Sequence, residues 1–127
     1  MRADLDHVHI FASDITATVD FFVHMLGATV VWDEDVAGAR SVRLALERGF
    51  VHVYDQPPPG ERGGAIHHIG IETVDLDALV AHMTAKGFAF RKPVRDEPAF
   101  RYVMAAGPDG LLIELFECHE RERWRIG

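Results

Sequence analysis

Two stretches of the chain alternate apolar and polar residues in the manner typical of half-buried β-strands. Residues 6–15 (DHVHIFASDI) and 67–76 (HHIGIETVDL) each contain a histidine that is followed seven residues later by an aspartate. Successive side chains of a strand point to opposite faces, so His7 and His9 share one face, opposite Val8. The two stretches therefore predict similar strands in the two halves of the chain.

Each strand is followed by a pattern that predicts a helix. In the first half the apolar spacing is that of an amphipathic helix, with Ser13 or Asp14 as N-cap and Gly27 at the end. In the second half the helix is expected over about residues 76–86, closed by Gly87.

Three further strands are expected in each half. In the first half they are residues 28–32, 41–46 and 50–54, with a polar turn at 33–38 and a tight hairpin at 47–49. In the second half they are residues 88–90, 100–105 and 111–116, with a polar turn at 96–98 and another at 107–110.

The two halves repeat with a nearly constant offset. His7 and His68 lie 61 residues apart, Gly27 and Gly87 lie 60 apart, and His52 and Glu114 lie 62 apart. Such a period signals duplication, and one unit alone leaves a sheet face unburied. We therefore expect one α+β domain over residues 1–127. Its modules 5–56 and 65–117 are joined by a Pro- and Gly-rich linker, 57–64.

Composition excludes several classes of function. With 127 residues and 48% hydrophobic residues the chain can form a core, while its net charge of −7 argues against nucleic acid as a partner. No apolar run is long enough to cross a membrane, and residues 1–6 do not resemble a signal peptide. A single cysteine, Cys118, excludes an internal disulfide and fits the cytoplasm.

Four strands place a metal-ligand type of side chain opposite their aliphatic face. A lone histidine in a strand is more often a core or surface residue than a ligand, and a lone glutamate can face solvent. Four such groups at matching places in a duplicated chain favour a metal site, because a divalent cation offsets the cost of enclosing them. The expected ligands are His7, His52, His68 and Glu114. We expect His67 to point away from this site.

At these residues the chain resembles the vicinal-oxygen-chelate superfamily, which contains glyoxalase I, bleomycin-resistance proteins and extradiol dioxygenases. The resemblance covers residues 5–117. Its motifs are DHV at 6–8 with DI at 14–15, FF and LG within 21–27, HIGIE at 68–72 and PDGLLIEL at 108–115. It implies two βαβββ modules that form an incomplete barrel around one divalent ion (Ni, Co, Mn, Zn or Fe) held by the four expected ligands.

The resemblance also implies a choice of chemistry. Glyoxalase I and methylmalonyl-CoA epimerase are similar in using four protein ligands, with Lewis-acid stabilisation of an enediolate or enolate. Extradiol dioxygenases use Fe(II) and only the equivalents of His7, His68 and Glu114, so a histidine at position 52 favours a lyase, isomerase or epimerase. A ring-cleaving dioxygenase and a small-molecule binding protein that confers antibiotic resistance are the alternatives. A homodimer is expected on the resemblance alone.

Other residues are candidates for catalysis and substrate binding. The base would be Glu114, Glu72 or His9. Either of two arginines at matching places, Arg43 and Arg101, would hold a substrate carboxylate, or else would be solvated. The aromatic residues Phe11, Tyr54, Phe100 and Phe116 would form a pocket wall or belong to the core.

Overall fold

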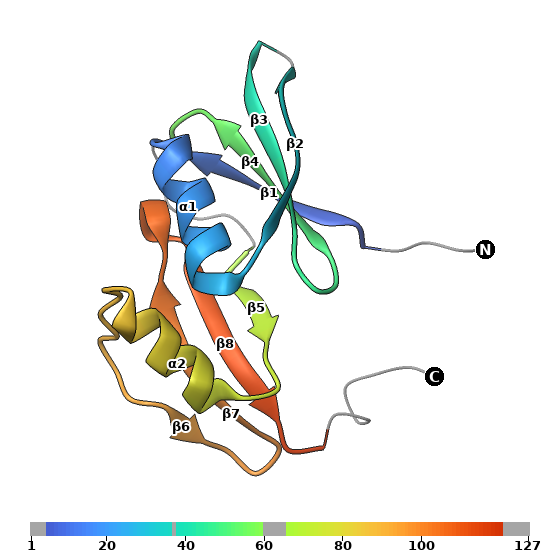
Figure 1. The fold of residues 1–127 in the computed structure, drawn as a ribbon. Coiled ribbons are helices and arrows are strands. Elements are labelled where there is room, and N and C mark those ends of the chain that lie inside the picture. Colours follow the sequence, from blue (N-terminus) through green and yellow to red (C-terminus); the bar gives the residue numbers. More distant parts are fainter. Residues whose placement is uncertain (1–4, 37, 60–65, 121–127) are drawn as a thin grey trace, which may run out of the picture. The chain divides into compact units, whose positions relative to one another are not determined.

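The computed structural model describes residues 5–36, 38–59 and 66–120, and the chain divides into two compact units, residues 1–62 and 63–127. Each unit has the order βαβββ, with a helix on one face of a four-stranded mixed sheet (Figure 1). The α+β class and the repeated βαβββ order are thus confirmed. In the part of the chain that is described, no helix is long and apolar enough to cross a membrane.

The first unit is built around the sheet β1-β4-β3-β2, in which only β1 and β4 are parallel. Its elements are β1 (His7–Ala12), α1 (Ile15–Leu26), β2 (Thr29–Val36), β3 (Ala39–Ala45) and β4 (Phe50–Asp55). The core contains Phe22 of α1 together with Leu44 and Val53 of the sheet, all fully buried. Helix α1 begins where the Asp14 side chain accepts a hydrogen bond from the Ala17 amide, as the sequence predicts.

One prediction for this unit is wrong. Residues 33–36 are not a turn, because β2 continues to Val36 and pairs with β3 along its whole length. The segment is polar because β2 is an edge strand whose residues 33–36 are exposed. Arg40 of β3 donates two hydrogen bonds to the Asp33 carboxylate, at 2.9 and 2.8 Å, and so ties the two strands together.

The second unit repeats this plan with the sheet β5-β8-β7-β6, in which β5 and β8 are parallel. Its elements are β5 (Ile69–Glu72), α2 (Leu76–Ala85), β6 (Arg95–Asp96), β7 (Phe100–Ala106), the short 3-10 helix η1 (Pro108–Gly110) and β8 (Leu112–Cys118). The buried residues Leu76 and Met83 of α2 belong to the same core as Ile113 and Leu115 of β8. The Asp75 side chain caps α2 by accepting from the Ala78 amide at 3.0 Å.

The strand predicted at residues 88–90 is absent. The Phe88 amide instead donates to the Met83 carbonyl at 3.0 Å and closes the end of α2, where Gly87 has a φ of +96°. The edge strand is the two-residue β6, so Asp96, expected in a turn, pairs with Arg101.

Strand pairing shows which positions of the two units correspond. His9 lies beside His52 in the first unit, and Gly70 lies beside Glu114 in the second. On the other side of the same residues, Arg43 pairs with His52 and Met104 pairs with Glu114. The counterpart of Arg43 is therefore Met104. The predicted match between Arg43 and Arg101 is wrong by three residues.

Candidate functional site

In the first unit, His7 and His52 stack face to face. Their ring centroids are 3.8 Å apart and their planes differ by 9°. Nδ1 of His7 lies 2.9 Å from Oδ2 of Asp6, and because a carboxylate only accepts, Nδ1 carries the proton and Nε2 faces away from this bond. Asp6, His7 and His52 each offer one atom that can bind a metal. These three atoms all lie within 4.8 Å of one another, which is close enough to share a cation.

Arg43 donates hydrogen bonds to both Asp6 and His52. Its guanidinium donates to the Asp6 carboxylate at 2.8 and 3.2 Å and to Nε2 of His52 at 2.7 Å. Its Cζ lies 3.6 Å from the ring centroid of Phe50, a cation–π contact. Arginine has only donors, so Nε2 of His52 is the acceptor and holds no proton. The guanidinium thus occupies the lone pair that a metal at this nitrogen would use.

His52 is held neutral by its surroundings. Burial lowers the pKa of its imidazole, and the nearby His7 and Arg43 lower this pKa further. The Asp6 carboxyl has a pKa well below its usual range, because it accepts hydrogen bonds from Arg43, which has the larger effect, and from His7. A neutral imidazole beside an ionised carboxylate is the protonation state that metal binding requires.

A bulge in β2 brings Trp32 to His52. The register of β2 on β3 shifts between Val30 and Trp32, so Trp32 pairs with Arg43 and its ring lies 5.4 Å from that of His52. Bulges often redirect a side chain in this way beside a functional site. The periodic pattern of residues 28–32 gives no sign of this shift, and sequence analysis missed Trp32.

His9 and Tyr54 extend the same face of the first sheet. The His9 ring lies 5.3 Å from Phe11 and 5.5 Å from Tyr54. These contacts show that His9 and Phe11 of β1 lie on the same face of the sheet as Tyr54 of β4, as the alternation of side chains predicts. His9 is two residues along β1 from His7 and directly beside His52 in the sheet.

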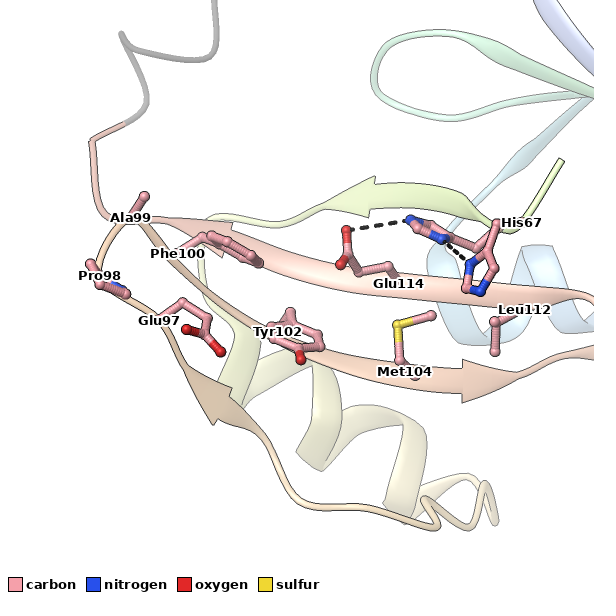
Figure 2. A pocket seen from close by; sticks show the side chains of 10 residues that line it. His67, Glu97, Pro98, Ala99, Phe100, Tyr102, Met104, Leu112 and Glu114 are labelled. Atoms are coloured by element: carbon pink, nitrogen blue, oxygen red, sulfur yellow. Dashed lines mark hydrogen bonds and ion pairs between the residues drawn. The ribbon is translucent and has the colours of Figure 1, made fainter. Parts of the chain in front are cut away.

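In the second unit, a pocket of about 620 Å³ lies over β7 and β8 (Figure 2). His68 and Glu114 lie in it together, with Nε2 of His68 3.8 Å from Oε1 of Glu114. Phe100, Tyr102 and Met104 supply its wall from β7. Its volume is in the range of small-molecule sites.

His67 also lines this pocket, contrary to expectation. Its Nδ1 lies 2.8 Å from Nδ1 of His68, so one ring donates to the other (Figure 2). The reason is that β5 begins only at Ile69. His67 and His68 precede the strand, and the alternation of strand faces does not apply to them.

Gly70 keeps the space beside Glu114 open. A Cβ atom at this position would lie 3.2 Å from the Phe116 ring and 4.0 Å from Oε1 of Glu114. The corresponding position of the first unit carries the imidazole of His9, so the two units differ here. The absence of a side chain at position 70 leaves the Glu114 carboxylate accessible from β5.

Glu97 is a pocket residue that sequence analysis missed. The sequence pattern predicts a polar turn here, yet the Glu97 side chain is half-buried and lines the cavity beside Pro98 and Phe100 (Figure 2). Its amide donates to the Phe100 carbonyl at 2.8 Å, which holds the turn against the start of β7. Polarity and the proline indicate a turn, but they do not indicate which way a side chain points.

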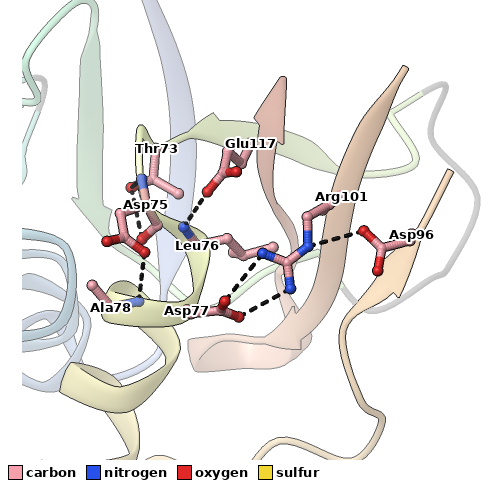
Figure 3. Close-up of polar contacts among 8 residues, drawn as sticks. All are labelled: Thr73, Asp75, Leu76, Asp77, Ala78, Asp96, Arg101 and Glu117. Atoms are coloured by element: carbon pink, nitrogen blue, oxygen red, sulfur yellow. Dashed lines mark hydrogen bonds and ion pairs between the residues drawn. The ribbon is translucent and has the colours of Figure 1, made fainter. Parts of the chain in front are cut away.

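Arg101 lies on the other face of the second sheet, toward α2 (Figure 3). It donates to the Asp77 carboxylate at 3.2 and 3.0 Å and to Asp96 at 2.9 Å. Beside it, Glu117 accepts from the Leu76 amide at the start of α2. Arg101 does not line the pocket, since its neighbours Phe100 and Tyr102 point the opposite way.

Comparison with known proteins identifies the family. The model of the Glyoxalase/Bleomycin resistance protein/Dioxygenase superfamily matches residues 4–115, most of the chain. The chain belongs to this superfamily. The resemblance inferred from the DHV, HIGIE and PDGLLIEL motifs is thus confirmed.

Three proteins with different descriptions are similar to this chain. It is 28% identical over 123 residues to the uncharacterized protein YwkD of Bacillus subtilis (89% of this chain, 95% of YwkD). Among solved structures it resembles a mutant of the fosfomycin resistance protein FosX of Listeria monocytogenes, complexed with Mn(II) and dihydroxypropylphosphonic acid (TM-score 0.78, 18% identity, 98% and 100% coverage). It also resembles TnmS3, an antibiotic binding protein from Streptomyces (TM-score 0.76, 23%, 92% and 97%).

These comparisons agree on the fold and leave the activity open. The superfamily includes enzymes and binding proteins, and some members bind a divalent metal. Within this chain, each unit brings together two of the four expected ligands, His7 with His52 and His68 with Glu114. Whether the two pairs share one ion remains a prediction.

Proposed function

We propose that the protein is a divalent-metal-dependent lyase, isomerase or epimerase that acts on a small substrate with two neighbouring oxygens. The observation that carries this proposal is the paired arrangement of ligand-type side chains, with one pair at the matching position of each unit. The proposed ligands of one ion are His7, His52, His68 and Glu114.

The first pair fits such an ion. The Asp6 carboxylate fixes the proton of His7 on Nδ1, as a carboxylate does for many metal-bound histidines, and leaves Nε2 as the ligand atom. His52 is unprotonated at Nε2, so it needs to lose only its contact with Arg43. Three imidazoles and one carboxylate suit Ni, Co, Mn, Zn or Fe.

A bound cation would act as a Lewis acid on the substrate oxygens and stabilise the charge of an enolate or enediolate. The chain's own residues would supply proton transfer. Glu114 is the first candidate, because its carboxylate faces the pocket beside His68. His9 is the second, since it lies beside His52. Glu72 lies farther along β5 and does not line the pocket, which makes it the weaker candidate.

Substrate contacts follow from the same placement. Phe100 would pack against the substrate body in the pocket of the second unit, and Tyr54 would do so on the matching face of the first. Once released from His52, one N–H of Arg43 would be available to a negatively charged substrate oxygen while the guanidinium stays paired with Asp6. Arg101 is left out of the proposed site because two carboxylates hold it near α2.

The test is metal content followed by turnover. Protein purified without chelator or histidine tag is analysed for first-row metals, then reloaded and assayed with thiol adducts of 2-oxoaldehydes and with epimerisable acyl-CoA thioesters. Turnover that needs metal but no oxygen supports the proposal. Oxygen uptake with a catechol and Fe(II) would instead indicate a ring-cleaving dioxygenase. Stoichiometric ligand binding without turnover or metal would indicate a binding protein, as TnmS3 is described.

A further inference from the structure

We propose that the pocket of the second unit selects ligands with a flat apolar body and an ammonium group, and that Glu97 binds this ammonium. The inference rests on the proposed function at one point, the chelation of neighbouring oxygens at the His68–Glu114 end. It adds a preference for the charge and shape of the part of the ligand that lies away from the chelated oxygens, which the metal site alone does not specify.

The pocket wall favours a flat apolar body. Phe100 and Tyr102 lie side by side on β7, with ring centroids 5.4 Å apart and planes inclined by 33°. Met104 continues the wall along β7, and Leu112 does so on β8 (Figure 2). Aromatic rings and a thioether favour contact with the face or edge of another ring.

The polar groups of the pocket lie at separate places along this wall. Glu114 pairs with Met104 of β7. The Glu97 amide instead donates to the carbonyl of Phe100, which precedes Met104 by four residues on the same strand. Four residues along a strand correspond to about 13 Å between the backbone positions of Phe100 and Met104. A single-ring ligand with oxygens at one end and a short charged arm at the other has suitable proportions.

Glu97 is the group that would recognise the arm. Its carboxylate is half-buried at the pocket wall, and no hydrogen bond or ion pair to it is found among the described residues. Arg95, the cation nearest in sequence, does not line the pocket, and Arg101 is held on the opposite face. A partly desolvated carboxylate without a cation gains from an ammonium ligand and repels an anionic one.

The experiment compares three catechols that differ only in their arm. Dopamine carries an ammonium, 4-ethylcatechol is neutral, and 3-(3,4-dihydroxyphenyl)propionate carries a carboxylate. Each is titrated calorimetrically, without oxygen, into Ni(II)-loaded and metal-free protein. The variants are Glu97→Gln and Glu97→Lys, and Glu47→Gln, in the exposed hairpin of the first unit, is the matched control.

We expect dopamine to bind the wild type about tenfold more tightly than 4-ethylcatechol, the gain of one charge-assisted hydrogen bond. Glu97→Gln should abolish this preference, Glu97→Lys should reverse it in favour of the carboxylate, and Glu47→Gln should retain it. Equal affinities for all three ligands in the wild type, a preference that survives Glu97→Gln, or no binding of any probe would overturn the inference. A preference for dopamine with no dependence on Ni(II) would support Glu97 as the selector and count against the metal site.

Discussion

The imidazole rings of His7 and His52 lie parallel with their centroids 3.8 Å apart, one on β1 and the other on the neighbouring strand β4. Their outer edges are held by Asp6 and Arg43, which also bind each other. This network leaves Nε2 of His52 unprotonated and holds the two imidazole rings close to one another. Arg43 thus stabilises the metal-free pair and competes with a metal for His52.

Replacing Arg43 should therefore strengthen metal binding. Arg43→Met copies the residue at the matching position of the second unit, Met104. It removes a positive charge and a donor from His52 and leaves the Asp6 carboxylate uncompensated, so we expect roughly tenfold tighter Co(II) binding. Calorimetric titration measures this change. Arg48→Met, in the hairpin between β3 and β4, is the control, and unchanged or weaker binding by Arg43→Met would count against the competition.

A side chain at position 70 should disturb the second pair. Gly70→Ala places a methyl group 3.2 Å from the Phe116 ring and 4.0 Å from the Glu114 carboxylate. Since the Phe116 ring must give way, we expect a destabilisation of about 1 kcal/mol and weaker Co(II) binding. Urea unfolding and metal titration on the same protein measure the two effects. Normal stability and normal affinity together would show that the space beside Glu114 is not needed.

The ion pair between Arg101 and Asp77 should make stability depend on pH (Figure 3). The hydrogen bonds from Arg101 lower the pKa of Asp77 below its ordinary value, so the carboxylate form favours the folded state. This contribution is present above the unfolded pKa of about 3.9 and disappears as the pH falls through the lower folded pKa. Asp77→Asn should thus be less stable than wild type at pH 7 in urea unfolding, and the difference should shrink below about pH 4 and in high salt. A difference that is constant with pH would contradict this assignment.

Thr18 offers a stabilising substitution away from the site. Its side chain is fully buried in α1, and its hydroxyl finds no hydrogen-bond partner among the described residues. Thr18→Val keeps the shape and removes the unpaired polar atom, so we expect a gain of about 1 kcal/mol in the free energy of unfolding. Thermal and urea unfolding provide the measurement, with Thr16→Val on the exposed side of α1 as control. Destabilisation by Thr18→Val would indicate that the hydroxyl is paired in solution.

Much of this architecture is predictable from local sequence patterns. Asp14 and Asp75 start the two helices as expected, because a side-chain oxygen that caps a helix is a local feature. The offset of about 61 residues correctly matched His52 with Glu114, which occupy equivalent places in the two sheets. The same offset makes Met104 the counterpart of Arg43. The match between Arg43 and Arg101 is wrong because the two residues share a type but differ in strand register.

The features that sequence analysis missed depend on irregular backbone or on contacts distant in the chain. Trp32 reaches His52 through a bulge, and His67 enters the pocket because it precedes the strand. Glu97 projects from a turn, where no periodicity fixes the direction of a side chain. The link between Asp6 and Arg43 joins residues 37 positions apart, and either residue alone is an ordinary charged side chain in the sequence.

The central claim, that the two pairs hold one ion, is tested most directly by the stoichiometry of metal binding. Chelator-treated protein is titrated with Co(II), and the bound metal is counted per chain in wild type, His7→Ala/His52→Ala, His68→Ala/Glu114→Ala and the control His24→Ala. We predict one ion per chain in the wild type and the control, and a loss of at least about a hundredfold in affinity when either pair is removed. Two ions per chain, or tight binding that survives the loss of one pair, would contradict the account.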